Sequence, residues 1–308
     1  MPPPPTSALV WDFAVSEMEN NRMLIVRKIM TKARSYLPLI KSLQTGLLLS
    51  TGIAGYLSAH TALNLGILLS LTGSLFLAIS GSTILNMWYD KDIDTVMNRT
   101  HNRPLASGKV TKQEAFWLGL FLSFVGVGWA VMQDSLFGLV VFAGLFFDVV
   151  VYTIWLKRRT SWSIVWGGIS GGMPILAGRA LAIGQIDLVG ILLMMAVVFW
   201  IPTHILTFNM RYFTDYQTAR VPTFPSMYGF EATRAIIALS AILAAASIGV
   251  AGVMIGIQAG ALRLMAVLST GLLLLSFATV FQPSEQANFS LFKYASIYML
   301  ASMIMLSL

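Results

Sequence analysis

Around residue 90, an amide and two carboxylates are spaced four residues apart. The segment reads Asn86-Met-Trp-Tyr-Asp90-Lys-Asp92-Ile-Asp94. In a helix, each step of four residues turns by only about 40° and rises about 6 Å, so Asn86, Asp90 and Asp94 would form one stripe. Asp92 would point to the opposite side. Oxygen ligands arranged in this way suit Mg²⁺, which keeps bound water and shares the phosphate oxygens of a substrate.

Two arginines follow these carboxylates closely. Arg99 and Arg103 are spaced to fork onto anionic oxygens. Carboxylates followed by arginines predict a diphosphate group bridged by metal ions. The alternative is a solvated loop in which the acids pair with the arginines of the same loop.

A second polar segment runs from His204 to Pro225 and contains a single carboxylate. Asn209 and Asp215 are placed to serve a second metal ion opposite the first. His204 lies about one to two helical turns before Asn209. A single histidine among apolar residues is more often a packing residue than a ligand.

A third group of candidates lies between residues 148 and 159. Lys157 and Arg158 belong to a basic run that either clamps a diphosphate from another side or only anchors a helix end. Asp148 precedes Lys157 by enough residues to lie about 13 Å inside that helix end, and it shares a face with Tyr152. An acid at that depth in a membrane marks a functional site by default. The structural alternative is a hydrogen bond to a neighbouring helix.

The composition requires lipid as the solvent for these elements. Of the 308 residues, 56% are hydrophobic and only 11% are charged, against about 25% charged residues in soluble domains. Cysteine is absent, which excludes disulfides, Cys-ligated metal centres and cysteine nucleophiles. The formal net charge of +7 reflects membrane topology and does not indicate a nucleic-acid partner.

Nine apolar stretches are long enough to cross a bilayer, which takes about 20 residues per helix. They are 37–59, 62–86, 112–132, 135–157, 161–182, 186–209, 231–257, 261–282 and 290–308. Barrels are excluded because these runs are continuous and about twice the length of a strand. We therefore predict an all-α, polytopic membrane protein with nine transmembrane helices around a central cavity that opens to the cytoplasmic side.

The lysines and arginines predict the orientation. All of them except Arg179 and Arg263 fall on one side of the membrane, and such an excess marks the cytoplasmic side. The N-terminus is therefore predicted to be cytoplasmic and the C-terminus to lie outside. Residues 1–35 form a separate cytoplasmic segment, either an interfacial amphipathic helix or a loosely ordered tail. Residues 36–308 form the membrane domain.

Several of these strings resemble one family. The spacing Asn86-x3-Asp90-x3-Asp94 is similar to the first aspartate motif of the UbiA-type intramembrane prenyltransferases. The longer string 86–108, the helix ending 152–159 and the run 200–225 resemble the haem branch of that family, which farnesylates protohaem IX. The similarity extends through most of residues 36–300.

The resemblance implies Mg²⁺-dependent transfer of a farnesyl or geranylgeranyl group from its diphosphate to a membrane-associated acceptor. In the haem branch the acceptor is a vinyl group of protohaem IX (haem B), and the product is haem O. The implied location is a prokaryotic cell membrane. The implied site residues are Asn86, Asp90, Asp94, Asn209 and Asp215 for the metal, Lys41, Arg99, Arg103, Lys157 and Arg158 for the diphosphate, Asp148 and Tyr152 for catalysis, and His204 for the acceptor.

The sequence departs from the haem branch mainly around the second motif and the cavity. Thr214 stands where a second acid is usual, Arg220 stands where glycine is usual, and Asp148 replaces an expected aromatic residue. These departures leave two other acceptors open, an aromatic quinone precursor and a glycerol-phosphate lipid. A cation transporter is a more remote alternative, favoured only by Asp148 and by the glycines and proline of stretch 161–182.

Overall fold

A computed structural model describes residues 22–23, 27, 30, 32–60 and 62–307, and these residues contain helices and no strand. The segment 1–35, predicted as an amphipathic helix or a tail, lies mostly outside the described residues. Its last four residues, 32–35, are helical. There Lys32 donates a hydrogen bond of 2.9 Å to Glu114.

Each of the nine predicted stretches overlaps one long helix. One shorter helix precedes the first long helix, and two others lie between later ones. The long helices are α2 (Ser42–Leu57), α3 (Leu65–Tyr89), α5 (Lys112–Gln133), α6 (Ser135–Phe146) with its continuation η2 (Phe147–Leu156), α7 (Ser163–Ile183), α8 (Leu188–Arg211), α10 (Phe224–Ile255), α11 (Ala259–Phe281) and α12 (Glu285–Leu306). The shorter ones are η1 (Leu37–Ile40), α4 (Lys91–Val96) and α9 (Phe213–Thr218).

Within the described part of the chain, seven helices are long and apolar enough to cross a membrane. This confirms an all-α, polytopic integral membrane protein. The two remaining long helices are α2, which has only 16 residues, and α7, whose glycines and Arg179 dilute its apolar character. The count of nine crossings depends on these two helices and stays a prediction.

Side chains cap the starts of three of the long helices. Asn64 caps α3, Thr111 and Glu114 form a reciprocal capping box at α5, and Asp134 caps α6 directly after α5 ends. Each cap satisfies backbone N–H groups that have no partner within the helix. The chain can therefore reverse within a few residues and return through the bundle.

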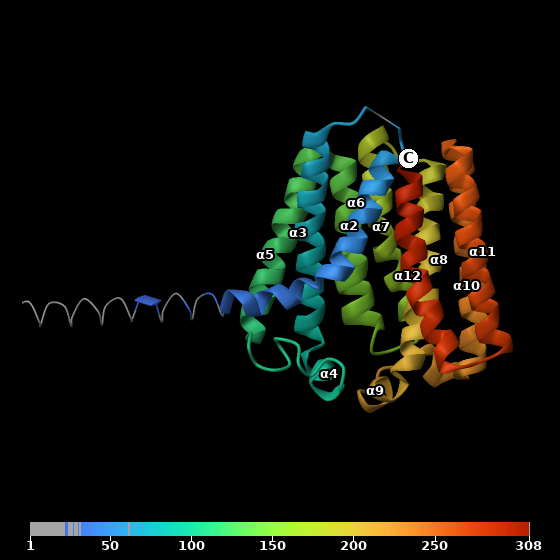
Figure 1. Cartoon of the computed structure of the whole chain (residues 1–308). Coiled ribbons are helices and arrows are strands. Elements are labelled where there is room, and N and C mark those ends of the chain that lie inside the picture. Colours follow the sequence, from blue (N-terminus) through green and yellow to red (C-terminus); the bar gives the residue numbers. More distant parts are fainter. Residues whose placement is uncertain (1–21, 24–26, 28–29, 31, 61, 308) are drawn as a thin grey trace, which may run out of the picture.

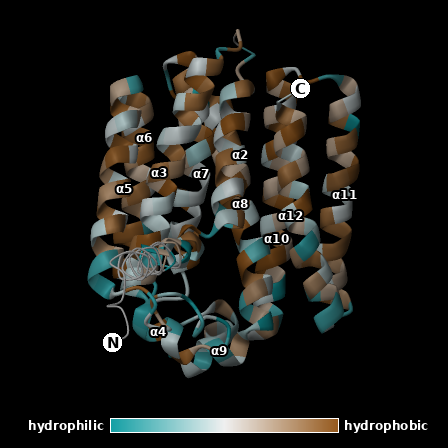
Figure 2. Ribbon diagram, turned by 60° about the vertical axis from the view of Figure 1, so that its left-hand side comes forward, coloured by the Kyte–Doolittle hydropathy of each residue, from teal (hydrophilic) through white to brown (hydrophobic). Residues whose placement is uncertain are grey.

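The helices run roughly side by side, and the two polar connections lie at the same end of the bundle. Figure 1 shows α4 and α9 close to one another at the end opposite the C-terminus. Figure 2 shows hydrophilic residues gathered at this end, whereas the bodies of the helices are mostly hydrophobic. Many large apolar side chains on the helix bodies are exposed, including Phe124 at 79%, as a lipid-facing surface requires.

Two apolar clusters flank the centre of the bundle. The larger one is built mainly from α8, α10, α11 and α12. The smaller one comes mainly from α3, α6 and the middle of α7. Helix α7 contributes to both clusters, and it also packs against α2.

Glycines set the closest helix crossing, between α2 and α7. A Cβ atom built on Gly178 would lie 1.9 Å from the carbonyl oxygen of Gly52, and one on Gly55 would lie 2.0 Å from that of Ile175. Both neighbours are backbone atoms, which cannot move aside alone. Small residues at this crossing let the two backbones touch.

We expect Gly178→Ala to destabilise the protein by about 1–3 kcal/mol, the usual effect of overpacking. Thermal unfolding in detergent would measure the loss. The matched control is Gly249→Ala in α10, where an added Cβ meets no atom within 4 Å. Equal unfolding temperatures for the two variants would contradict the close crossing.

Candidate functional site

The predicted stripe keeps its helical spacing across the junction between α3 and α4. Asp90 N–H donates to the carbonyl of Asn86 at 3.0 Å, and Asp94 N–H donates to that of Asp90 at 2.8 Å. All three side chains are buried, with Asp90 only 1% exposed. Four residues before Asn86, Ser82 lines a cavity in the bundle. The stripe thus leads from the cavity to the end that carries α4 and α9.

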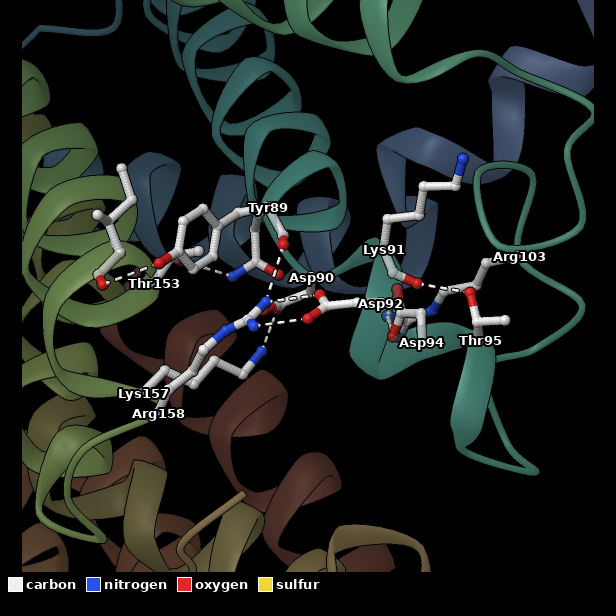
Figure 3. Close-up of polar contacts among 12 residues, drawn as sticks. Tyr89, Asp90, Lys91, Asp92, Asp94, Thr95, Arg103, Thr153, Lys157 and Arg158 are labelled. Carbon is white, nitrogen blue, oxygen red and sulfur yellow. Dashed lines mark hydrogen bonds and ion pairs between the residues drawn. The ribbon is translucent and has the colours of Figure 1, made fainter. Parts of the chain in front are cut away.

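Two basic residues at the end of η2 approach Asp90. Lys157 forms an ion pair with the carboxylate, and a guanidinium nitrogen of Arg158 lies 3.8 Å from its Oδ1 atom. Figure 3 shows both basic side chains reaching from one element toward the acidic residues of the other. The Oδ1 atom of Asp90 is buried and accepts no hydrogen bond. A buried carboxylate oxygen without a donor is available to a further positive ligand.

Arg103 holds the second carboxylate of the stripe. One of its guanidinium nitrogens donates to both oxygens of Asp94, at 2.8 Å each. The carboxylate is nearly buried, whereas the Arg103 side chain is 25% exposed. The pairing of Asp94 with Arg103 agrees with the alternative of a loop whose acids bind its own arginines. However, that alternative expects a solvated loop, and the Asp94 carboxylate is buried.

Asp92 lies on the other side, as the helical spacing predicts. Its side chain is 66% exposed and accepts two hydrogen bonds of 2.7 Å from Arg158. The hydrogen-bonded guanidinium lowers the pKa of the Asp92 carboxyl below its ordinary value. Asp92 is thus an exposed ion-pair partner, distinct from the buried stripe.

The second polar segment meets the first at α9. The carboxylate of Asp215 accepts hydrogen bonds from the backbone N–H of Arg99 at 3.1 Å and from the Asn98 amide at 3.3 Å. An apolar contact among Ile93, Met97 and Val221 supports this junction. Asp215 therefore joins the two connections, while Asn209 is buried near the end of α8.

Arg99, a predicted diphosphate ligand, packs against aromatic rings, whereas the charge of Lys41, another predicted ligand, interacts with those of Asp94 and Asp148. The Arg99 guanidinium lies 4.8 Å from the ring centre of Phe208 and 5.6 Å from that of Tyr212, both on or beside α8. Lys41 lies between η1 and α2 with a left-handed backbone (φ 49°). Arg99 and Arg103 thus contact different partners, and their joint binding of anionic oxygens stays a prediction.

No three acidic or histidine side chains among the described residues converge into a ready metal site. Mg²⁺ does not need one, because it commonly binds one or two carboxylates and takes its other oxygens from water and phosphate. Asp90 and Asp94 fit this pattern, since both are buried carboxylates and Asp90 keeps one oxygen without a hydrogen bond.

A cavity of about 580 Å³ lies between α2, α3, α6, η2, α7, α8 and α12, and its lining is mainly apolar. Asp148 and Tyr152 from η2 both line it. Asp148 is hydrogen-bonded to the hydroxyl of Ser82, which also faces the cavity. η2 is a π-helical segment, a rare geometry that often marks functional sites.

His204 also lines the cavity, but its ring faces are covered. It stacks on Trp200 with a centroid distance of 4.9 Å and on Phe292 with one of 4.5 Å. Its Nδ1 atom lies 3.3 Å from the hydroxyl of Ser296. Only the edge of the imidazole remains for a ligand.

Sequence reasoning missed the hydroxyl groups that hold the acids and the amide in place. Ser82 bonds Asp148, and Thr153 accepts a hydrogen bond of 2.8 Å from the Asn86 amide. The available signal was the helical spacing, because Ser82 precedes Asn86 by four residues and shares its stripe.

Arg220 adopts a left-handed backbone with φ 54°, a conformation that costs a non-glycine residue about 1–2 kcal/mol. It lies between α9 and the start of α10. The structure thus explains why glycine suits this position.

We expect Arg220→Gly to raise the free energy of unfolding by about 1 kcal/mol, measured by denaturation in detergent. Thr218→Gly, in the helical conformation of α9, is the control and should be destabilising. An Arg220→Gly variant that is less stable than the parent would show that contacts of the arginine outweigh the backbone strain.

The comparisons with known proteins agree with the fold. Residues 47–300 match the UbiA prenyltransferase family. The chain is therefore a membrane-embedded prenyltransferase. It belongs to the UbiA prenyltransferase family.

Its relatives include several protoheme IX farnesyltransferases. A protoheme IX farnesyltransferase of Korarchaeum cryptofilum is 42% identical over 212 residues, which cover 69% of this chain and 72% of that protein. Protoheme IX farnesyltransferase 1 of Pyrobaculum aerophilum is 36% identical over 266 residues, or 85% and 94% of the two chains.

Solved structures share the fold at low sequence identity. A digeranylgeranylglyceryl phosphate synthase aligns with a TM-score of 0.75 at 16% identity, covering 90% of this chain and 98% of that chain. A UbiA homolog from Archaeoglobus fulgidus, bound to GPP and Mg²⁺, aligns with a TM-score of 0.65 at 14% identity, covering 89% and 100%.

Proposed function

We propose that this protein transfers a farnesyl or geranylgeranyl group from its diphosphate to a vinyl group of protohaem IX, giving haem O. One observation carries the proposal. Two neighbouring rows of side chains connect the apolar cavity with the charged end. One runs from Ser82 to Asp94 on α3 and α4, and the other runs from Asp148 on η2 to Lys157 at its end. The names of the relatives supply the acceptor.

The charged end of these rows suits a diphosphate leaving group. Mg²⁺ bound there would neutralise the oxygens of the diphosphate and so promote its departure. Asp90 and Asp94 are the main proposed metal ligands. Asn86 on α3, Asn209 on α8 and Asp215 on α9 complete the proposed metal-binding set. Lys157, Arg158 and Arg103 already lie beside these carboxylates, and each can turn its donors onto phosphate oxygens. Arg99 and Lys41 complete the proposed basic set.

The reaction breaks the bond between C1 of the prenyl group and the diphosphate oxygen, and the diphosphate leaves with the electron pair. C1 then bonds to the terminal vinyl carbon of the acceptor. Water adds to the resulting cation and loses a proton, which leaves a hydroxyalkyl product. An apolar cavity keeps water from capturing the prenyl cation at C1 before the acceptor has reacted.

Two cavity residues are placed to assist this step. Asp148 brings a carboxylate into the apolar lining, where it can stabilise a developing positive charge. Tyr152 lies between it and the charged end, with Lys157 Nζ 5.6 Å from its ring centre. We assign the edge of His204 to contact with the acceptor.

The same proposal covers topology and domains. The end that carries α4 and α9 faces the cytoplasm, the cavity opens to that side, and the C-terminus lies outside. The membrane is that of a prokaryotic cell, residues 36–308 are the catalytic domain, and residues 1–35 are a cytoplasmic segment.

Product mass spectrometry tests the activity. The purified protein would be incubated with Mg²⁺, haem B and dimethylallyl, geranyl, farnesyl or geranylgeranyl diphosphate in turn. We expect a haem product that has gained one prenyl group and one water, with the two longest substrates preferred. Prenylation of an aromatic acid or a glycerol phosphate, with haem unchanged, would replace the acceptor and keep the reaction class.

A further inference from the structure

A row of aromatic rings runs from the cavity toward the charged end along α8 and α12. On α8 the row comprises Trp200, His204 and Phe208, each four residues from the next, and on α12 it comprises Phe292 and Phe289. Neighbouring ring centres lie 4.5–6.1 Å apart. We call these five rings the aromatic row. Trp200, His204 and Phe292 line the cavity.

Two cations lie on the outer ring of this row. The Arg211 guanidinium carbon is 4.0 Å from the centre of the Phe289 ring, and the Lys293 ammonium is 4.4 Å from it. Neither has a carboxylate partner among the salt bridges of the described residues. Both side chains are exposed. Two positive charges from different helices thus converge on one ring without an anion.

The geometry leaves their donors free. A guanidinium stacked on an aromatic face keeps its N–H edge available for a carboxylate, and the ring limits the motion of both side chains. Basic residues that only fix the orientation of a helix at the cytoplasmic side need no shared ring. They also need no aromatic row that leads into a cavity.

The dimensions suit a planar ligand with an anionic edge. Eleven residues of α8 separate Trp200 from Arg211, which corresponds to about 16 Å along the helix. A flat apolar body could lie along the inner rings, and carboxylates at one edge would then reach Arg211 and Lys293.

We propose that Arg211 and Lys293 form a carboxylate-binding subsite that orients the acceptor by its anionic edge. For protohaem IX, the groups bound would be its two propionates. This inference rests on the proposed function for the identity of the acceptor. It is distinct from the basic residues that flank Asp90 and Asp94, although Arg99 of the proposed diphosphate set stacks on Phe208 within the aromatic row.

The test is equilibrium binding, followed by the visible absorption of the porphyrin, in nanodiscs made of zwitterionic lipid only. The whole protein, Arg211→Gln, Lys293→Gln and the double variant would be titrated with haem B and with its dimethyl ester. The matched control is Arg234→Gln on α10, where another arginine lies 5.9 Å from the centre of the Phe230 ring.

We expect each single variant to raise the Kd for haem B about tenfold, the loss of one charge-assisted hydrogen bond, and the double variant to raise it further. The Kd for the dimethyl ester should be the same in all variants, and Arg234→Gln should bind haem B as the parent does. An unchanged Kd for haem B in the double variant would overturn the subsite while the proposed function stands. So would equal losses for the acid and the ester.

Failure of the proposed function has a different signature. If the parent protein does not bind haem B, the same titrations would be run with a prenylatable aromatic carboxylic acid. Weaker binding of that acid by the double variant would support the carboxylate subsite and reject haem as the acceptor. Equal binding by all variants would reject both.

Discussion

Asp90→Asn is expected to lower Mg²⁺-dependent prenyl transfer at least about 10²–10³-fold, the usual effect of removing one preorganised electrostatic contact. The asparagine keeps the shape of the side chain but loses the charge that would bind the metal. Asp90 is 1% exposed, and one of its oxygens accepts no hydrogen bond from the described residues, so this oxygen is available to a metal ion. Pyrophosphate release at saturating Mg²⁺ would measure the effect.

Asp92→Asn is the matched control, since it removes a carboxylate from the same short segment. Asp92 is exposed, and its salt-bridge partner among the described residues is Arg158. Exposed ion pairs contribute little to stability. Activity should therefore stay within about twofold of the parent. Full activity of Asp90→Asn would remove the metal assignment.

The Asp90 variant leaves the Lys157 ammonium without its carboxylate, which can impair folding. Asp94→Asn provides a second variant, because its partner Arg103 is partly exposed and can reach water. We expect the same loss of transfer with an unchanged unfolding temperature. A folded Asp94→Asn protein with normal turnover would contradict the role of the stripe.

Asp148→Asn is expected to lower kcat about 100-fold or more and to leave the KM for the prenyl diphosphate unchanged. Asp148 faces the apolar cavity and lies nine residues before Lys157. Its charge can therefore act on a cation that forms in the cavity, where the low dielectric strengthens the interaction. Steady-state kinetics with varied prenyl diphosphate would separate the two constants.

Ser82→Ala is the control for Asp148, because it removes the hydrogen bond and keeps the carboxylate. Loss of one neutral donor costs about 1 kcal/mol, so kcat should fall less than about tenfold. If Asp148→Asn turns over like the parent, Asp148 has the structural role that its bond to Ser82 also allows.

The apolar stretches predicted the fold well because lipid restricts spanning segments to long helices and closed barrels. Boundaries were less predictable. The last apolar stretch was predicted to start at residue 290, yet α12 begins at Glu285 with Ser284 as its cap. Helix α10 begins at Phe224, before the predicted 231, and it passes a kink at Gly229 (φ 81°). These boundaries depend on a capping serine and on a glycine, and a search for apolar stretches detects neither.

The residues of the site were easier to predict than their partners. The stripe from Asn86 to Asp94 follows from helical spacing within one segment. By contrast, the ion pair between Asp90 and Lys157 joins α3 to η2 across the bundle. Arg99 also makes a contact with a distant segment, which its spacing could not predict. That spacing to Arg103 indicates a shared ligand, but the Arg99 guanidinium packs against Phe208.

The geometry of η2 could not be predicted from periodicity. A π-helical segment differs from an α-helix by one residue in its hydrogen-bond pattern, here seen where Lys157 N–H donates to the carbonyl of Tyr152. That pattern changes the angles between side chains on the segment that carries Asp148, Tyr152 and Lys157. Sequence spacing alone placed Asp148 and Tyr152 on one face, and the cavity lining includes both.

The most direct test is a structure of the protein with Mn²⁺ and an unreactive prenyl thiodiphosphate. Anomalous scattering would locate the metal independently of the ligand. We predict metal density bridging the diphosphate to Asp90 and Asp94, with Lys157 and Arg103 turned onto phosphate oxygens and the prenyl chain in the cavity beside Asp148. Metal and diphosphate bound elsewhere, with both carboxylates still paired to their basic partners, would contradict the account.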